Sequence, residues 1–274
     1  IVMRCVIIYF MLFLSCEFPI AQIKMNIDFQ HCKQSHFQEF LDTNTWDKND
    51  RLYNVSCPRV YFYKAKNSNT KKSVIICPGG GFKFLAINQE GRYLAEKLAH
   101  HGINSFVFYY KTHPIAQKNL NKEYTVLREK LLSTASLDLQ RIIYHLRKKS
   151  KDLQINANDI GLIGFSAGGS LAVETVLSSS ISDKPNFLAA VYTGNWVTKY
   201  TSPPKNTPLF LSCSKDDPLG LYPVTMELSE LWERSNEEVK LLIYEKGGHG
   251  YGMNKKGLPL DGWSDEFINW VLKL

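Results

Sequence analysis

Ser166 lies at the centre of a G-x-S-x-G sequence whose glycines are Gly164 and Gly168. A short apolar run over 160–165 leads into it, and a run of helical period follows. A serine on a sharp turn from strand to helix needs small neighbours, because side chains at 164 and 168 would collide with the turn. The turn exposes the hydroxyl, and the helix places positive potential beside a developing anion. The pattern predicts a nucleophilic serine; the competing interpretation is a glycine-rich turn whose serine only caps the helix.

Only one of the seven histidines, His249, follows Ser166 in the chain. It lies in a glycine-rich segment over 247–252, after an apolar run over 239–244. Glycines there allow the imidazole to reach over the edge of a sheet, where it can take the proton of a serine hydroxyl. On such a scaffold the acid and the histidine follow the serine in that order. We therefore predict that His249 is the general base.

The turn after the apolar run over 209–214 carries two carboxylates, Asp216 and Asp217. A carboxylate at that place can hold Nδ1 of the histidine, so that Nε2 is left to deprotonate the serine. We favour Asp217, because the sequence Asp217-Pro218-Leu219 resembles the acid turn of esterases. Asp216 is then expected to be solvated or to cap the next turn.

A second glycine-rich segment covers 79–81 and follows the apolar run over 74–77. An oxyanion hole needs two or more backbone N–H groups aimed at one point, which requires glycines where the backbone approaches the substrate. Pro78 has no N–H, so we predict Gly80, Gly81 and Ala167 as the donors. The alternative, a phosphate-binding loop, lacks its lysine and its glycine spacing here.

From residue 60 onward, short β-branched runs alternate with longer runs of helical period. This alternation predicts an α/β fold with a mostly parallel central sheet and helices on both faces. Residues 26–53 are expected to be irregular, and 111–132 is an ambiguous connection that could become helical toward its end. The expected strands cover 60–63, 74–77, 103–110, 160–165, 187–192, 209–214 and 239–244, and the expected helices cover 90–101, 133–149, 167–178, 223–234 and 265–272.

The chain has 274 residues, of which 44% are hydrophobic and 22% are charged, and its net charge is +7. These values exclude the disordered, collagen-like and coiled-coil classes. Residues 1–21 contain an early arginine and an apolar run over 5–14, which predicts a secretory signal peptide. We expect 22–57 to be an N-terminal extension and 58–274 to be the catalytic domain. The protein would be exported without a stable membrane span, and lipidation at Cys16 is the alternative.

Four cysteines follow the predicted leader, and none has a metal-binding spacing to another cysteine or to a histidine. We therefore predict no metal site. Acyl transfer by a serine, a histidine and an aspartate needs no cofactor, and none is predicted. Cys77 and Cys213 lie in or at the end of apolar runs and are expected to be buried, whereas Cys32 and Cys57 could form a disulfide in an oxidising compartment. The basic residues are scattered in short runs, which argues against a nucleic-acid partner.

Taken together, these motifs resemble those of α/β-hydrolases of the carboxylesterase and acetyl-xylan-esterase type, close to bacterial esterases that are joined to or encoded beside xylanases. The resemblance spans 58–274 and rests on I-I-C-P-G-G-G-F at 75–82, E-G at 90–91, I-G-F-S-A-G-G at 163–169 and Y-E-K-G-G-H-G-Y-G at 244–252. Pro78 departs from the better-known pattern, in which many relatives have histidine. This departure leaves the predicted N–H donors of the oxyanion hole in place. It removes a histidine side chain that could otherwise support the loop over 79–81.

The resemblance implies a secreted serine esterase that removes O-acyl groups, chiefly O-acetyl, from a plant or algal polysaccharide such as xylan. The implied partner is an acylated carbohydrate. Phe82, Trp196 and Tyr251 lie in loops expected to face the site, where an aromatic ring would stack on a sugar or wall a small acyl pocket. Three alternatives stay open: a general short-chain carboxylesterase, a feruloyl esterase, and a non-catalytic binding protein on a hydrolase scaffold.

Overall fold

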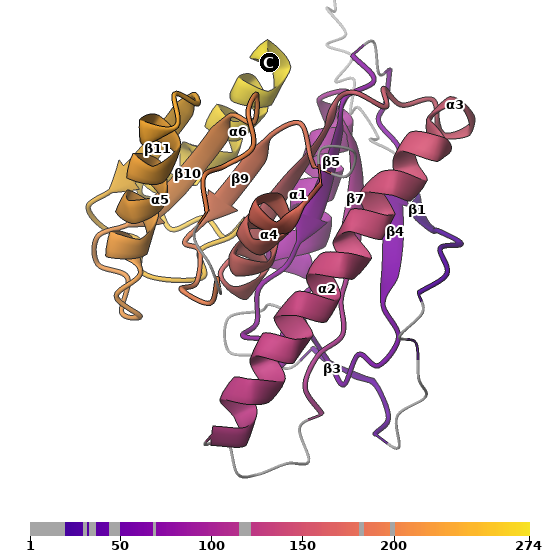
Figure 1. Cartoon of the computed structure of the whole chain (residues 1–274), viewed down its shortest axis with the longest axis horizontal. Helices are drawn as coiled ribbons and strands as arrows, with labels where there is room; N and C mark the ends of the chain where they lie inside the picture. Colours follow the sequence, from indigo (N-terminus) through magenta and orange to yellow (C-terminus); the bar gives the residue numbers. More distant parts are fainter. Residues whose placement is uncertain are drawn as a thin grey trace, which may run out of the picture.

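An eight-stranded sheet forms the centre of the molecule (Figure 1). The computed structural model describes residues 20–29, 32, 37–43, 50–67, 70–114, 122–180, 184–197 and 201–274. The first two strands of the sheet are antiparallel to their neighbours, and all later pairs are parallel. The prediction of a mostly parallel α/β sheet is confirmed. In spatial order the strands are β1 (Gln22–Lys24), β4 (Arg59–Tyr63), β7 (Asn104–Tyr109), β5 (Ser73–Cys77), β8 (Ile160–Phe165), β9 (Leu188–Val191), β10 (Leu209–Ser214) and β11 (Val239–Tyr244).

Helices cover both faces of this sheet. On one face α2 (Lys122–Lys148) packs against α4 (Ala167–Ser178), with α5 (Tyr222–Arg234) beside β10, and the short α3 (Ser150–Leu153) follows α2. On the other face lie α1 (Tyr93–His100) and α6 (Trp263–Lys273), joined by an ion pair between Lys97 and Asp265. Because β5, β7, β8 and β10 are buried along their whole length, they carry near-continuous apolar runs, as strands covered on both faces do.

The predicted strands over 160–165, 209–214 and 239–244 and the predicted helix over 167–178 have the expected bounds. Two other helices differ more. The helix expected over 90–101 is divided into a π-helical turn η1 (Asn88–Arg92) and α1. The helix expected from residue 133 begins at Lys122. Leu131 and Leu132 extend its buried face, but the polar residues around them hide the helical spacing of apolar residues in the sequence. A 3-10 turn η2 (Pro259–Gly262) leads into α6.

The expectation that 26–53 is irregular is wrong for part of this segment. The strands β2 (Phe40–Asp42) and β3 (Arg51–Tyr53) form an antiparallel sheet with β6 (Phe84–Ala86), which follows the glycine segment at 79–81. Strands of three residues are too short for an alternating pattern to stand out. The small sheet matters for the site, because it brings Arg51 beside the pocket described below.

Cys32 and Cys57 form a disulfide, and Cys77 and Cys213 are free and buried. Burial raises the pKa of both free thiols. The predicted leader, including Cys16, lies outside the described residues apart from its last two positions. None of the helices in the described part of the chain has the length and hydrophobicity needed to cross a bilayer.

Candidate active site

Ser166 stands on a tight turn between β8 and α4, with φ 50° and ψ −115°. This is a strained conformation for a residue with a side chain, and such strain is typical of a nucleophile turn. A Cβ at Gly164 would lie 2.1 Å from the carbonyl oxygen of Gly168, and a Cβ at Gly168 would lie 2.1 Å from that of Cys77. The two glycines are therefore required by close backbone contacts, as the sequence pattern predicted.

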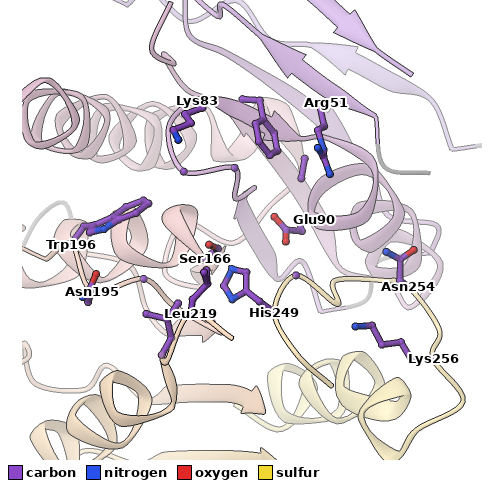
Figure 2. A pocket seen from close by; sticks show the side chains of 17 residues that line it. Arg51, Lys83, Glu90, Ser166, Asn195, Trp196, Leu219, His249, Asn254 and Lys256 are labelled. Carbon is purple, nitrogen blue, oxygen red and sulfur yellow. Dashed lines mark hydrogen bonds between the residues drawn. The ribbon is translucent and has the colours of Figure 1, made fainter. Parts of the chain in front are cut away.

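The structure brings Ser166, His249 and Asp217 together in one chain of hydrogen-bonding groups (Figure 2 shows Ser166 and His249). Nε2 of His249 lies 2.9 Å from Oγ of Ser166, and Nδ1 lies 2.8 Å from Oδ2 of Asp217. The Asp217 side chain is fully buried, and its Oδ1 accepts the N–H of Leu219 at 2.8 Å. This arrangement can move a proton from the serine to the imidazole while the carboxylate holds the ring in one tautomer.

Asp216 has a different position. Its side chain is exposed, and Oδ1 accepts the N–H of Gly248 at 2.7 Å. The carboxylate is solvent-exposed, as the sequence suggested, and it also ties the turn after β10 to the loop that carries His249.

The glycine segment that follows β5 is held from two sides. The hydroxyl of Tyr110 donates to the carbonyl of Pro78 at 2.5 Å, and the N–H of Gly79 donates to Oε2 of Glu90 at 2.7 Å. Gly80 and Gly81 come next and line the pocket together with Ser166. The N–H of Gly79 is thus engaged by Glu90, whereas Gly80 and Gly81, the residues predicted as donors, border the pocket.

The buried carboxylate of Glu90 also reaches the histidine loop. Its Oε1 accepts the hydroxyl of Tyr192 at 2.8 Å, and the same hydroxyl accepts the N–H of Gly252 at 2.9 Å. The edge of the Tyr192 ring packs against the His249 imidazole, with ring centroids 4.9 Å apart. Burial, then the nearby Glu90 carboxylate, raises the pKa of the Tyr192 hydroxyl well above its ordinary value.

Sequence reasoning did not assign roles to Glu90 or Tyr192. An acid beside Gly91, at the start of an apolar helix face, was the signal available for Glu90. Tyr192 offered none, because a tyrosine at the end of a buried strand is indistinguishable from a core residue.

Ser166 and His249 open into a pocket of about 660 Å³. Trp196 lines it as predicted, but Phe82 and Tyr251 do not. Both are fully buried: the Phe82 ring packs against Tyr110 and Trp196, and the Tyr251 hydroxyl is hydrogen-bonded to that of Ser212 at 2.8 Å. Within the described residues, no cluster of three or more histidine, cysteine or carboxylate side chains is arranged to hold a metal ion. The pocket is lined by Arg51, Gly80, Gly81, Lys83, Phe84, Ala86, Glu90, Ser166, Gly194, Asn195, Trp196, Leu219, Leu221, His249, Gly250, Asn254 and Lys256.

The chain is similar to a family model, to curated proteins and to solved structures of hydrolases. Residues 60–189 match the family described as BD-FAE. An acetylxylan esterase from Xylanibacter ruminicola is 22% identical over 73% of this chain and 45% of its own length. An endo-1,4-beta-xylanase B from Butyrivibrio fibrisolvens is 27% identical over 47% of this chain and 20% of its own length. A solved acetyl ester-xyloside bifunctional hydrolase from Caldicellulosiruptor lactoaceticus superposes with a TM-score of 0.63 at 22% identity, covering 80% of this chain and 89% of that one.

The chain spans less than half the length of these two curated relatives. The solved structures share its arrangement of strands and helices at low identity, which establishes the fold. The chain therefore has the α/β-hydrolase fold, and the resemblance to carboxylesterases of the acetylxylan-esterase type expected from its sequence is confirmed.

Proposed function

We propose that the protein is a serine esterase that hydrolyses O-acyl groups, chiefly O-acetyl, on a polysaccharide such as xylan. The observation that carries this proposal is the chain from Asp217 through His249 to Ser166, with separations of 2.8 and 2.9 Å. The Ser166 hydroxyl attacks the ester carbonyl while Nε2 of His249 takes its proton, and the imidazolium then protonates the leaving alcohol. A water molecule then attacks the acyl-enzyme carbonyl while His249 takes its proton. The proton returns to the Ser166 oxygen as the carboxylic acid is released.

The negative charge that develops on the carbonyl oxygen needs donors beside Ser166. We assign them to the N–H groups of Gly80, Gly81 and Ala167. Ala167 begins α4, and the first N–H groups of a helix have no partner within that helix. The positive end of the helix adds to the stabilisation of the oxyanion.

The substrate assignment is supported by the names of the relatives, an acetylxylan esterase and a xylanase. Export is supported by the disulfide between Cys32 and Cys57, because such bonds persist in oxidising compartments. We place the catalytic domain at 58–274, preceded by an N-terminal extension. The extension adds β1 to the main sheet, and it adds β2 and β3 to the small one.

The test is acetate release from acetylated xylan, run beside hydrolysis of short- and long-chain nitrophenyl esters, with wild type and Ser166→Ala in parallel. We expect wild type to release acetate from the polymer and Ser166→Ala to lose both activities. Turnover of short nitrophenyl esters alone would favour the general carboxylesterase, and preference for feruloylated material would favour the feruloyl esterase. No turnover of any ester would contradict the esterase assignment.

A further inference from the structure

The small sheet of β2, β3 and β6 buries one of its faces in the core. Leu52 of β3 lies opposite Leu85 of β6, and both side chains are buried in the hydrophobic core. Successive side chains of a strand alternate between the two faces of a sheet, and directly opposite residues share a face. The residues on either side of Leu52 and Leu85 in the chain therefore form the second face.

Three aromatic residues cross this second face side by side. Phe40 of β2 lies opposite Tyr53 of β3, and Tyr53 lies opposite Phe84 of β6. The ring centroids are 4.9 Å apart in the first pair and 5.3 Å apart in the second. Because neighbouring strands are about 4.8 Å apart, this aromatic row of Phe40, Tyr53 and Phe84 is roughly 10 Å long.

The aromatic row begins at the pocket and ends in solvent. Phe84 lines the pocket into which Ser166 opens. Tyr53, in the middle of the row, is partly buried, and Phe40, at the far end, is 46% exposed. The row is therefore a continuous apolar path from the wall of the pocket to the surface of the molecule.

The rings of the aromatic row are held in place by their neighbours. The Arg51 guanidinium lies 4.9 Å from the centroid of the Phe84 ring, on the face of β3 that also carries Tyr53. Phe84 thus packs against both Arg51 and Tyr53, and Tyr53 packs against both Phe84 and Phe40. Aromatic side chains offer a large contact area and lose little conformational entropy on binding, so a row that is already ordered is suited to hold a ligand.

The chemistry of the aromatic row matches a chain of sugars. The second face of an antiparallel sheet is normally polar when the first is buried, and exposed apolar surface beside a pocket is typical of a ligand-binding groove. A sugar ring carries C–H groups that can pack against aromatic rings, and it carries hydroxyls that can form a hydrogen bond with the Tyr53 hydroxyl. Linked sugar rings would therefore find both kinds of partner along the row.

We propose that the aromatic row binds the linked sugar rings of the acylated polysaccharide beside the ester that is hydrolysed. The inference rests on the proposed esterase function and adds a docking surface for the polymer outside the pocket. The row is continuous with the pocket through Phe84, and its other end at Phe40 is open to solvent. Because Phe40 and Tyr53 belong to the N-terminal extension, this extension takes part in binding the substrate.

The test uses acetylated xylan fragments of increasing length, with 4-nitrophenyl acetate as a substrate that is too small to reach Phe40 from the pocket. Acetate release gives kcat and KM for each fragment. For wild type we expect KM to fall as the fragments lengthen, with little change in kcat. Contacts far from the ester are made equally in the ground state and in the transition state, so they change KM alone.

Phe40→Ala should raise KM for the long fragments by about fivefold, which is the scale of one aromatic contact, and should weaken the dependence of KM on length. Phe40→Trp keeps a ring at this position and should retain the dependence. Leu41→Ala is the matched control, because Leu41 is 47% exposed and lies on the same strand but points to the opposite face. It should leave the dependence on length unchanged. KM does not depend on the concentration of active enzyme, so a variant that is partly unfolded is still informative.

The outcomes separate this inference from the function on which it rests. If wild type hydrolyses 4-nitrophenyl acetate but shows one KM for fragments of every length, or acts on none of them, the docking surface is wrong and the esterase stands. The same dependence on length in wild type and Phe40→Ala also overturns the surface. A wild-type dimer that dissociates in Phe40→Ala, with KM unchanged, would assign the row to a second copy of the chain instead. If wild type hydrolyses no ester at all, the proposed function fails and the docking surface fails with it.

Discussion

The Glu90 carboxylate accepts the Tyr192 hydroxyl at 2.8 Å, and Glu90 lines the pocket into which Ser166 opens. The other oxygen of the Glu90 carboxylate accepts the N–H of Gly79, and the hydroxyl oxygen of Tyr192 accepts the N–H of Gly252. One buried pair of side chains therefore connects the loop that supplies the proposed oxyanion donors with the loop that carries His249. We regard Glu90 as a positioning residue, because it acts on the reacting groups through the backbone of both loops.

Glu90→Gln should lower kcat by roughly tenfold or more with little change in KM, because the oxyanion donors matter most in the transition state. A carboxamide of the same shape accepts through one oxygen only, so the contact to Gly79 or the contact to Tyr192 is lost. Steady-state kinetics with 4-nitrophenyl acetate measure the effect. Glu96→Gln, in an exposed ion pair with Arg92, is the control and should leave both constants unchanged. An unchanged kcat in Glu90→Gln would refute the positioning role.

The two neighbouring aspartates allow a direct test of the proposed acid. Asp217→Asn should lower kcat by about 10⁴-fold, because the amide can no longer hold the correct tautomer of His249. Asp216→Asn should cost far less, since an amide oxygen can still accept the N–H of Gly248. Kinetics of both variants under one set of conditions give the ranking. The opposite ranking would mean that Asp216 is the acid.

The buried tyrosines predict a loss of stability at alkaline pH. Burial raises the pKa of Tyr192 and of Tyr251 well above the ordinary value, whereas in the unfolded chain both ionise at about pH 10. Their contribution is therefore complete below the unfolded-state pKa and declines as pH rises toward the folded-state pKa. Urea titrations should show the free energy of unfolding falling above about pH 10. The fall should be smaller in Tyr251→Phe than in wild type, and Tyr144→Phe, which changes an exposed ring, should reproduce the wild-type curve.

The disulfide between Cys32 and Cys57 closes a loop with a sequence separation of 25. Replacing both cysteines by serine should lower the free energy of unfolding by about 3.5 kcal/mol, mainly because the unfolded chain gains freedom. Denaturant titration measures the change. Reducing agent should produce the same change in wild type and none in the double variant. An effect of reducing agent on the double variant would show that the stabilisation has another source.

The strands of the main sheet and the catalytic candidates that follow them could be predicted from sequence. Buried parallel strands are continuous apolar runs, and they stop at turns that contain glycine or polar residues. Residues 160–165 and 209–214 are such buried runs, and 239–244 is a partly buried run at the edge of the sheet. Ser166, Asp217 and His249 lie at or beyond the carboxyl ends of these three strands. Because the carboxyl ends of parallel strands lie at the same edge of the sheet, the sequence predicts that these three side chains lie close together.

Side-chain direction could not be predicted in the same way. Phe82 and Trp196 looked equivalent, yet Phe82 has φ 57° and turns its ring into the core, whereas Trp196 reaches the pocket. Arg51 reaches the pocket only because β3 pairs with β6, a contact between strands of three residues that no local pattern reveals. The presence of Arg51 in the pocket lining thus depends on tertiary contacts, whereas the positions of the proposed catalytic groups follow from the strands.

The most direct test of the account is to trap the nucleophile. Wild type is incubated with a phosphonylating or phosphorylating ester, such as diethyl 4-nitrophenyl phosphate, and the adduct is located by peptide mass spectrometry while loss of esterase activity is followed. We predict one adduct, on Ser166, that forms in step with inactivation and forms far more slowly in His249→Ala. Inactivation with the adduct on another residue, or full activity with Ser166 modified, would contradict the account.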